Sequence, residues 1–234
     1  MSTVENAADI IIPVHNGYSH TRDMIENIYR FTDLPFHLYI IDNESTDETV
    51  DLGRIYTQDI TIIRNRHNQG WGISVNGGVP PGINQNIVFM RNDVAVSKGW
   101  LENMLVFLDT HPRIGAVGTL GSDSGDPQFV DNVRRKFAPQ IPLFKTCDIH
   151  ERNRILNYHF PRAGILIDGA LSFFCVAMKR RTIREVGLPE EPLGDGKTDA
   201  AYCRKLRKAG YVLGLSLATY VVRRTESGKL QKAV

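Results

Sequence analysis

The sequence predicts a fold of the α/β class, built on an open sheet with helices packed against it. Four short runs rich in Ile, Val and Leu have polar ends, as buried parallel strands do. Helical signals separate several of these runs, and such alternation favours right-handed crossovers within one sheet. The four runs are residues 9–15, 37–43, 60–65 and 86–93.

Helices are expected in the segments between and after these runs. Apolar residues between 24 and 31 recur on one helical face. Residues 45–48 have the S-x-x-E form of a capping box, which predicts a helix running toward Ile55. Apolar residues between 101 and 108 repeat at helical spacing until His-Pro at 111–112 stops them.

The second half of the chain is less regular. Residues 114–120 predict a further strand, whereas residues 121–165 are polar and aperiodic, which indicates a long functional loop or an irregular insertion. Regular patterns return with a strand in 169–180 and a short helix that ends at Gly187. The last elements are a helix over 199–209 and one or two strands in 211–222.

Composition restricts the class of protein. With 234 residues, 42% hydrophobic content and a net charge of +2, residues 1–234 are expected to form one domain. No apolar stretch approaches the roughly 20 residues of a membrane span and no signal start is visible, so we expect a cytoplasmic protein, soluble or peripheral at a membrane. Cys147, Cys175 and Cys203 suggest neither disulfides nor a zinc site. Basic clusters at 179–181 and 223–224 are too local to favour nucleic acid.

Acidic residues that end strands are the first candidates for a site. Ligands of open α/β sheets bind beyond the carboxyl ends of the strands, where Asp42 and Asp93 are expected on one rim. Either could instead be an ordinary cap or turn former. Residues 68–78 form a glycine- and asparagine-rich segment, which predicts a loop where backbone can approach a ligand. This segment lacks the spacing of a dinucleotide fingerprint or a phosphate loop, which disfavours dehydrogenases and kinases of those classes.

Six segments together carry a family resemblance: IIPVHNG, IIDNESTDET, NQGWGISVNGG, FMRNDVAV with GWLENML, DGALSFFCVAMKRRTIREVGLPEE and TDAAYCRKLRKAGY. In this order they resemble the inverting GT-A glycosyltransferases of family 2, especially the rhamnosyltransferase-like branch. The resemblance implies a single Rossmann-like GT-A domain with a mixed, mostly parallel central sheet flanked by helices. Residues 9–120 would bind the nucleotide sugar, and residues 166–234 would bind the acceptor and carry the catalytic base.

The resemblance also implies roles for individual residues. Asp199 would be the base that takes the proton of an acceptor hydroxyl, which inverts the anomeric centre. Thr198, Ala201 and Lys205 depart from the family's pattern around it. Asp93 would hold Mg²⁺ or Mn²⁺. The implied nucleotide-sugar ligands are Pro13, His15, Asn16, Asp42, Asn68, Gly70, Asn76, Arg91, Asn92 and Asp93.

Arginines stand where the family usually has metal ligands. Arg91 occupies the first position of the metal motif, and Arg223 and Arg224 follow the last strand where histidine is common. A guanidinium cannot coordinate a cation but can bind phosphate oxygens in pairs. We therefore predict that Arg91 with Arg223 or Arg224 supplies part of the positive charge at the diphosphate. Alternatively, Arg91 points to solvent while Asp93, water and the diphosphate hold Mg²⁺.

The acceptor is the least specified partner. Asp168 and Gly169 begin a segment that lines the acceptor side in relatives, and residues 121–165 are placed to act as an acceptor lid. A glycan or lipid-linked acceptor, as in polysaccharide biosynthesis, is what the resemblance implies. UDP, dTDP and GDP donors all fit the motifs. The departures also suit a degenerate protein that binds a nucleotide sugar or glycan without turnover.

Overall fold

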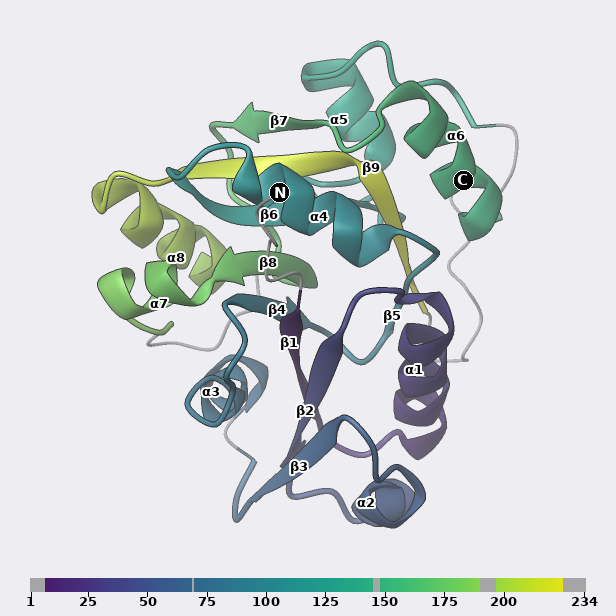
Figure 1. Ribbon diagram of the computed structural model, residues 1–234, viewed down its shortest axis with the longest axis vertical. Coiled ribbons are helices and arrows are strands. Elements are labelled where there is room, and N and C mark those ends of the chain that lie inside the picture. Colours follow the sequence, from purple (N-terminus) through teal and green to yellow (C-terminus); the bar gives the residue numbers. More distant parts are fainter. Residues whose placement is uncertain (1–6, 69, 145–147, 190–196, 225–234) are drawn as a thin grey trace.

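The computed structural model describes residues 7–68, 70–144, 148–189 and 197–224. In this part of the chain, a nine-stranded sheet has the order β3-β2-β1-β4-β8-β6-β9-β5, and β7 also pairs with β9 (Figure 1). The strands are β1 (Ala8–Val14), β2 (Phe36–Asn43), β3 (Ile60–Asn65), β4 (Asn86–Met90), β5 (Val94–Ala95), β6 (Ile114–Gly121), β7 (Gly164–Ile167), β8 (Cys175–Lys179) and β9 (Val212–Arg223). The helices are α1 (Tyr18–Phe31), η1 (Glu48–Asp51), α2 (Leu52–Ile55), α3 (Gly70–Gly78), α4 (Trp100–Asp109), α5 (Val130–Lys136), α6 (Ile149–His159), α7 (Arg180–Val186) and α8 (Lys197–Lys208).

The first half of the sheet is parallel. β1 pairs with both β2 and β4, and β2 pairs with β3, all in the parallel sense. The buried residues of α1 include Met24, Ile25 and Ile28, as the apolar pattern predicts. Because parallel neighbours end at the same edge, residues that follow β1, β2 and β4 gather on one rim.

The second half is mixed. β8 runs antiparallel to both of its neighbours, β4 and β6. β9 lies parallel to β6 and antiparallel to β7 and β5, so this one long strand joins three others. The predicted α/β class and the mixed sheet with flanking helices are confirmed.

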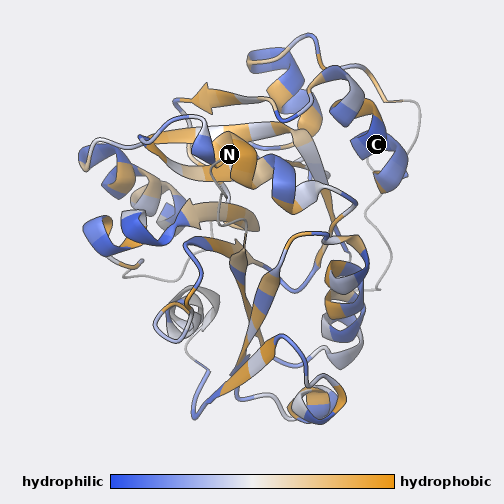
Figure 2. Ribbon diagram, in the orientation of Figure 1, coloured by the Kyte–Doolittle hydropathy of each residue, from blue (hydrophilic) through white to orange (hydrophobic). Residues whose placement is uncertain are grey.

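Two buried clusters lie on the two faces of the sheet. Ile11 and Ile41 belong to one cluster, and Ile10, Ile12 and Ile40 belong to the other. Successive residues of one strand thus enter opposite cores, as a sheet covered on both faces requires. Hydrophobic colour marks much of the central strands and part of α4, whereas α1, α6, α7 and α8 carry much hydrophilic colour (Figure 2).

Three local expectations are wrong, of which two concern residues 121–165 and 45–48. Residues 121–165 contain α5, α6 and the start of β7 rather than an irregular insertion. The capping box at 45–48 does not form: Asp47 caps η1 by accepting a hydrogen bond from the backbone N–H of Thr49. Ser45 is instead buried, and its hydroxyl oxygen accepts from the N–H of Asn16 at 2.8 Å.

The glycine-rich segment is also not a loop, since residues 70–78 form α3. Gly78 shows why glycine occurs there: a Cβ on it would lie 2.7 Å from Cγ2 of Ile11 in β1. The glycine therefore allows the helix to approach the sheet closely. Of the three cysteines, Cys175 and Cys203 are buried and free, and Cys147 lies outside the described residues.

Candidate active site

The segment between β4 and β5 carries the acid of the predicted metal motif. Asp93 follows β4, and Arg91 beside it is fixed through its backbone N–H, which donates to the carbonyl of Phe174 at 3.0 Å. Arg91 Nε lies 3.1 Å from Asp93 Oδ1, and Arg91 Nη2 lies 3.3 Å from Oδ2. Arg91 therefore faces the acid with its planar fork instead of extending into solvent.

A second guanidinium reaches the same carboxylate from the far end of the chain. Val94 pairs with Arg223 where β5 meets β9. Arg223 Nη2 then lies 3.0 Å from Asp93 Oδ2, and Nη1 lies 2.8 Å from Asp123 Oδ2. Burial alone would lower the pKa of Arg223, but the carboxylates of Asp93 and Asp123 raise it above its ordinary value. Arg223 is thus a permanent cation in this site.

The predicted base, Asp199, lies in one pocket with these two arginines. Asp199 is in the first turn of α8 and is buried, and its Oδ2 accepts from the backbone N–H of Phe173 at 3.1 Å. A cavity of about 280 Å³ is lined by Asp199, Arg91 and Arg223 among others. The fold therefore gathers a carboxylate and two guanidinium groups from both halves of the sequence.

Two acids of this pocket were missed in the sequence. Asp123 and Asp126 line it from the turn after β6, which is folded back by a hydrogen bond from Gly121 N–H to the Gln128 carbonyl at 2.9 Å. Burial raises the pKa of Asp126, although Ser172 and the Gln128 N–H oppose the shift. The signal for these acids in the sequence is an acidic, glycine-containing turn directly after a predicted strand.

The residues predicted to bind the nucleotide lie along the edge of β1, β2 and β3. Asp42 is buried, its Oδ1 accepts from the Ser45 N–H at 2.9 Å, and Arg64 Nε lies 3.7 Å from Oδ2. His15 Nδ1 lies 2.7 Å from the Asn43 carbonyl oxygen. Asp42 is therefore a turn former in this structure, with one arginine beside it.

Other predicted ligands surround this edge. Pro13 is buried in β1, and Asn16 has φ 56° and accepts from the Thr46 N–H at 2.8 Å. Asn68 accepts from the Gly70 N–H at 2.9 Å at the start of α3. Asn76 donates to the Pro189 carbonyl at 2.8 Å, and Asn92 donates to the Thr21 hydroxyl at 3.4 Å.

The remaining candidates lie apart from the Asp199 pocket. Arg224 Nη1 lies 2.9 Å from Asp23 Oδ2 on α1, so of the arginine pair only Arg223 lines the pocket. Asp168 is exposed after β7. Gly169 lines a second cavity, and its carbonyl accepts from Arg207 at 2.5 Å.

The donor set at Asp93 does not fit a protein-built metal centre. Both oxygens of this carboxylate already contact guanidinium groups, and hard divalent cations need several oxygen ligands with no cation among them. Within the ranges that the structure describes, no group of three or more His, Cys, Asp or Glu residues could hold a metal ion. The positive charge at this position comes from Arg91 and Arg223.

Sequence comparisons agree with the motif pattern. The family model described as Glycosyl transferase family 2 matches residues 9–187. An uncharacterized glycosyltransferase of Rickettsia felis is 26% identical over 151 residues, which is 62% of this chain and 25% of the relative. One of Haemophilus influenzae is 26% identical over 108 residues, 46% of this chain and 36% of the relative. The chain thus spans a quarter to about a third of these relatives.

Solved structures share the fold. A mannosyltransferase, PcManGT from Pyrobaculum calidifontis in complex with GDP-Man and Mn²⁺, aligns with a TM-score of 0.62 at 18% identity, over 87% of this chain and 52% of the other. GalNAc-T7 with UDP, GalNAc and Mn²⁺ aligns with a TM-score of 0.67 at 14% identity, over 95% of this chain and 45% of the other. These likenesses show a GT-A fold. Separately, none of the helices in the described part of the chain is long and apolar enough to cross a membrane.

Proposed function

Because the chain belongs to glycosyl transferase family 2, we propose that it moves a sugar from a nucleoside diphosphate to an acceptor hydroxyl with inversion. One observation carries the proposal: Asp199 shares a pocket with Arg91 and Arg223. A carboxylate that accepts a proton and guanidinium groups that receive a leaving anion are the two charges this reaction needs. The rhamnosyltransferase-like branch is part of the proposal on the motifs alone.

The reaction follows from these two charges. The acceptor oxygen attacks the anomeric carbon while the bond from that carbon to the diphosphate oxygen breaks. Asp199 takes the hydroxyl proton, and the diphosphate leaves with the electron pair of the broken bond. Attack and departure occur on opposite faces of the sugar, so the anomeric configuration inverts. Holding the reactants in line lowers the entropic part of the barrier.

We propose that Arg91 and Arg223 stabilise the negative charge on the leaving diphosphate. Each guanidinium presents two parallel N–H donors, a geometry that suits phosphate oxygens. In this assignment Asp93 orients the two guanidinium groups, since it contacts both of them. Mg²⁺ or Mn²⁺ held by Asp93, water and the diphosphate is the competing assignment, and the Mn²⁺ in similar structures favours it.

The donor is a nucleoside diphosphate sugar, with its nucleotide along the edge that carries Asp42, His15, Asn16 and the start of α3. The GDP-Man and UDP in similar structures support this class of donor. The acceptor side is formed by the segments before and after β7, including Asp168 and Gly169. A glycan or lipid-linked hydroxyl is the acceptor class that we propose.

The test compares Asp199→Asn with Asp33→Asn. The asparagine introduced by the first substitution can still accept from the Phe173 N–H, so the fold and nucleotide binding should be retained. Asp33 is 68% exposed beside Lys98, so its variant is a matched control for charge. Purified proteins are incubated with UDP-, dTDP- and GDP-sugars and glycan acceptors, and product is followed by mass spectrometry.

We expect Asp199→Asn to lose about 100-fold or more in turnover with unchanged nucleotide affinity, as loss of a general base does. Asp33→Asn should match the unmodified protein. Nucleotide binding without turnover in any variant would favour the degenerate, binding-only alternative. Failure to bind any of the three nucleoside diphosphates would refute donor binding itself.

A further inference from the structure

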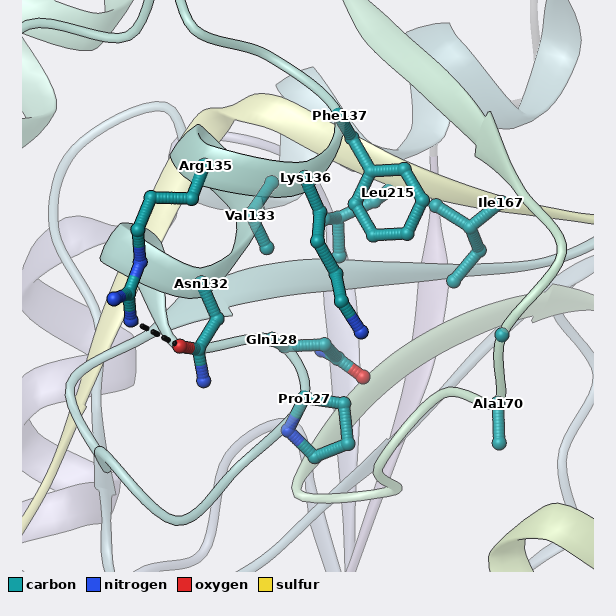
Figure 3. Close-up of a pocket in the computed structure, with 11 residues that line it drawn as sticks. Pro127, Gln128, Asn132, Val133, Arg135, Lys136, Phe137, Ile167, Ala170 and Leu215 are labelled. Atoms are coloured by element: carbon teal, nitrogen blue, oxygen red, sulfur yellow. Dashed lines mark hydrogen bonds between the residues drawn. The ribbon is translucent and has the colours of Figure 1, made fainter.

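A second cavity of about 370 Å³ lies beside the Asp199 pocket, between α5 and the end of β7 (Figure 3). Pro127 lines both cavities, so they adjoin at the turn after β6. Gln128 forms part of the shared wall: its amide donates to the Thr119 carbonyl at 2.7 Å and accepts from the Ser172 N–H at 2.6 Å. Ser172 itself lines the Asp199 pocket. The two cavities thus adjoin across Pro127 and Gln128.

The walls of this cavity are apolar on one side. Val133, Ile167 and Leu215 are buried and contribute to it, and the ring of Phe137 stands over them (Figure 3). Phe137 is 43% exposed, which is high for a phenylalanine beside a buried cluster. An exposed ring at the mouth of a cavity offers a flat surface on which the C–H face of a sugar can bury apolar area.

The same cavity is lined by a positively charged residue, Lys136, which is exposed. Helix α5 ends with three basic residues, of which Arg134 pairs with Asp131 at 3.6 Å and Arg135 donates to Asn132 Oδ1 at 2.8 Å. Lys136 has no hydrogen-bond or ion-pair partner among the described residues. Its side chain extends along the cavity with the ammonium group among the lining residues (Figure 3).

We propose that this cavity binds an anionic sugar unit of the acceptor, with Lys136 on the anionic group and Phe137 under the ring. The inference rests on the proposed transfer reaction and specifies the substrate class on its acceptor side. Three features favour this chemistry together: an aromatic platform, an ammonium group that pairs with none of the described residues, and a position next to the Asp199 pocket. An anionic group would form an ion pair with this ammonium group, whereas a neutral sugar would leave it hydrated by water.

The test measures sugar binding with the nucleotide site already filled. The probes are methyl glucoside, glucuronate and glucose 6-phosphate, titrated by ligand-observed NMR into protein saturated with UDP or GDP. Glucuronate and glucose 6-phosphate separate a carboxylate from a phosphate as the preferred group. The variants are Lys136→Gln and, as a charge-matched control, Lys98→Gln, whose side chain is 80% exposed beside Asp33.

We expect at least one anionic sugar to bind more tightly than methyl glucoside, and Lys136→Gln to weaken it about tenfold by removing a charge-assisted hydrogen bond. Methyl glucoside binding should be unchanged in Lys136→Gln, and Lys98→Gln should leave all three affinities as they are. Phe137→Leu should weaken every sugar that binds.

Equal affinity for charged and neutral sugars, absence of any sugar binding, or an unaffected Lys136→Gln variant would overturn the inference. Nucleotide affinity is measured in the same samples before sugar is added. Failure of all nucleotides to bind contradicts the proposed transfer reaction, whereas nucleotide binding with no anionic preference contradicts only the acceptor class.

Discussion

Substitution of Arg223 tests most directly how the protein stabilises a leaving diphosphate. This guanidinium contacts Asp93 at 3.0 Å and Asp123 at 2.8 Å. Hydrogen bonds to charged groups contribute about 1.5–3 kcal/mol each, so losing one should weaken diphosphate binding roughly 10- to 150-fold. We therefore expect Arg223→Gln to weaken UDP or GDP binding by that factor in the presence of chelator.

Asp123 competes for the same guanidinium and gives a prediction of opposite sign. The Arg223–Asp123 pair is 28% exposed on both sides, and such pairs contribute up to about 1 kcal/mol. Arg223 must give up its ion pair with Asp123 to bind the diphosphate, and Asp123→Asn removes that ion pair. The substitution should therefore tighten diphosphate binding by up to about fivefold. Isothermal titration calorimetry with chelator and with Mn²⁺, on both variants and on Asp33→Asn, measures each effect.

Two results would refute the reasoning about arginine. One is nucleotide binding that disappears in chelator and returns with Mn²⁺, with Arg223→Gln unchanged. The other is a weakening of binding by Asp123→Asn, which would make that carboxylate a ligand for a cation instead of a competitor for Arg223.

Three further predictions concern residues that affect the free energy of unfolding. Burial raises the Asp126 pKa above its ordinary 3.8, so the folded state favours the protonated acid and loses stability as pH rises through the raised pKa. Asp126→Asn should therefore raise the free energy of unfolding at neutral pH, and urea titrations should show a weaker dependence of that free energy on pH. Arg180→Met would leave Asp9, fully buried and paired with Arg180, without its countercharge, which should cost about 3–5 kcal/mol in chemical denaturation. Gly78→Ala should cost about 1–3 kcal/mol in the same assay through overpacking against β1, and an unchanged midpoint would show that the helix can shift.

Strands and long amphipathic helices could be predicted from the sequence because their buried positions are apolar and recur with the period of the element. The first four apolar runs became β1 to β4, and residues 101–108 lie within α4. α6 could not be predicted in this way, since Arg152 and Asn153 are among its buried residues. A helix that packs through polar side chains leaves no apolar period in the sequence.

Residues of the candidate site could be predicted only where they stand at positions of a recognisable motif. Asp93 and Asp199 stand at motif positions, and the structure brings Asp199 into one pocket with Arg91 and Arg223. The turn that carries Asp123 is held by local hydrogen bonds, in which Asp123 Oδ1 accepts from the Gly125 N–H at 3.0 Å. Its contact with Arg223 could not be predicted locally, because the two residues lie 100 positions apart in the sequence. The glycines of residues 68–78 likewise predicted a loop, although the physical reason for Gly78 is close packing of a helix.

The polar face of α6 has a consequence for how the protein behaves in solution. β7 pairs with β9 only as far as Ser216, and beyond that point side chains of α6 take over the outer backbone groups. Asn153 accepts from the Tyr220 N–H at 2.8 Å and donates to the Tyr220 carbonyl, while Asn157 donates to the Ala218 carbonyl at 3.0 Å. An unpaired strand edge is a template for adding foreign strands. These asparagines occupy that template at Ala218 and Tyr220, between the stretches of β9 that pair with β7 and with β5. This part of the edge is thus protected against edge-to-edge aggregation without a further strand.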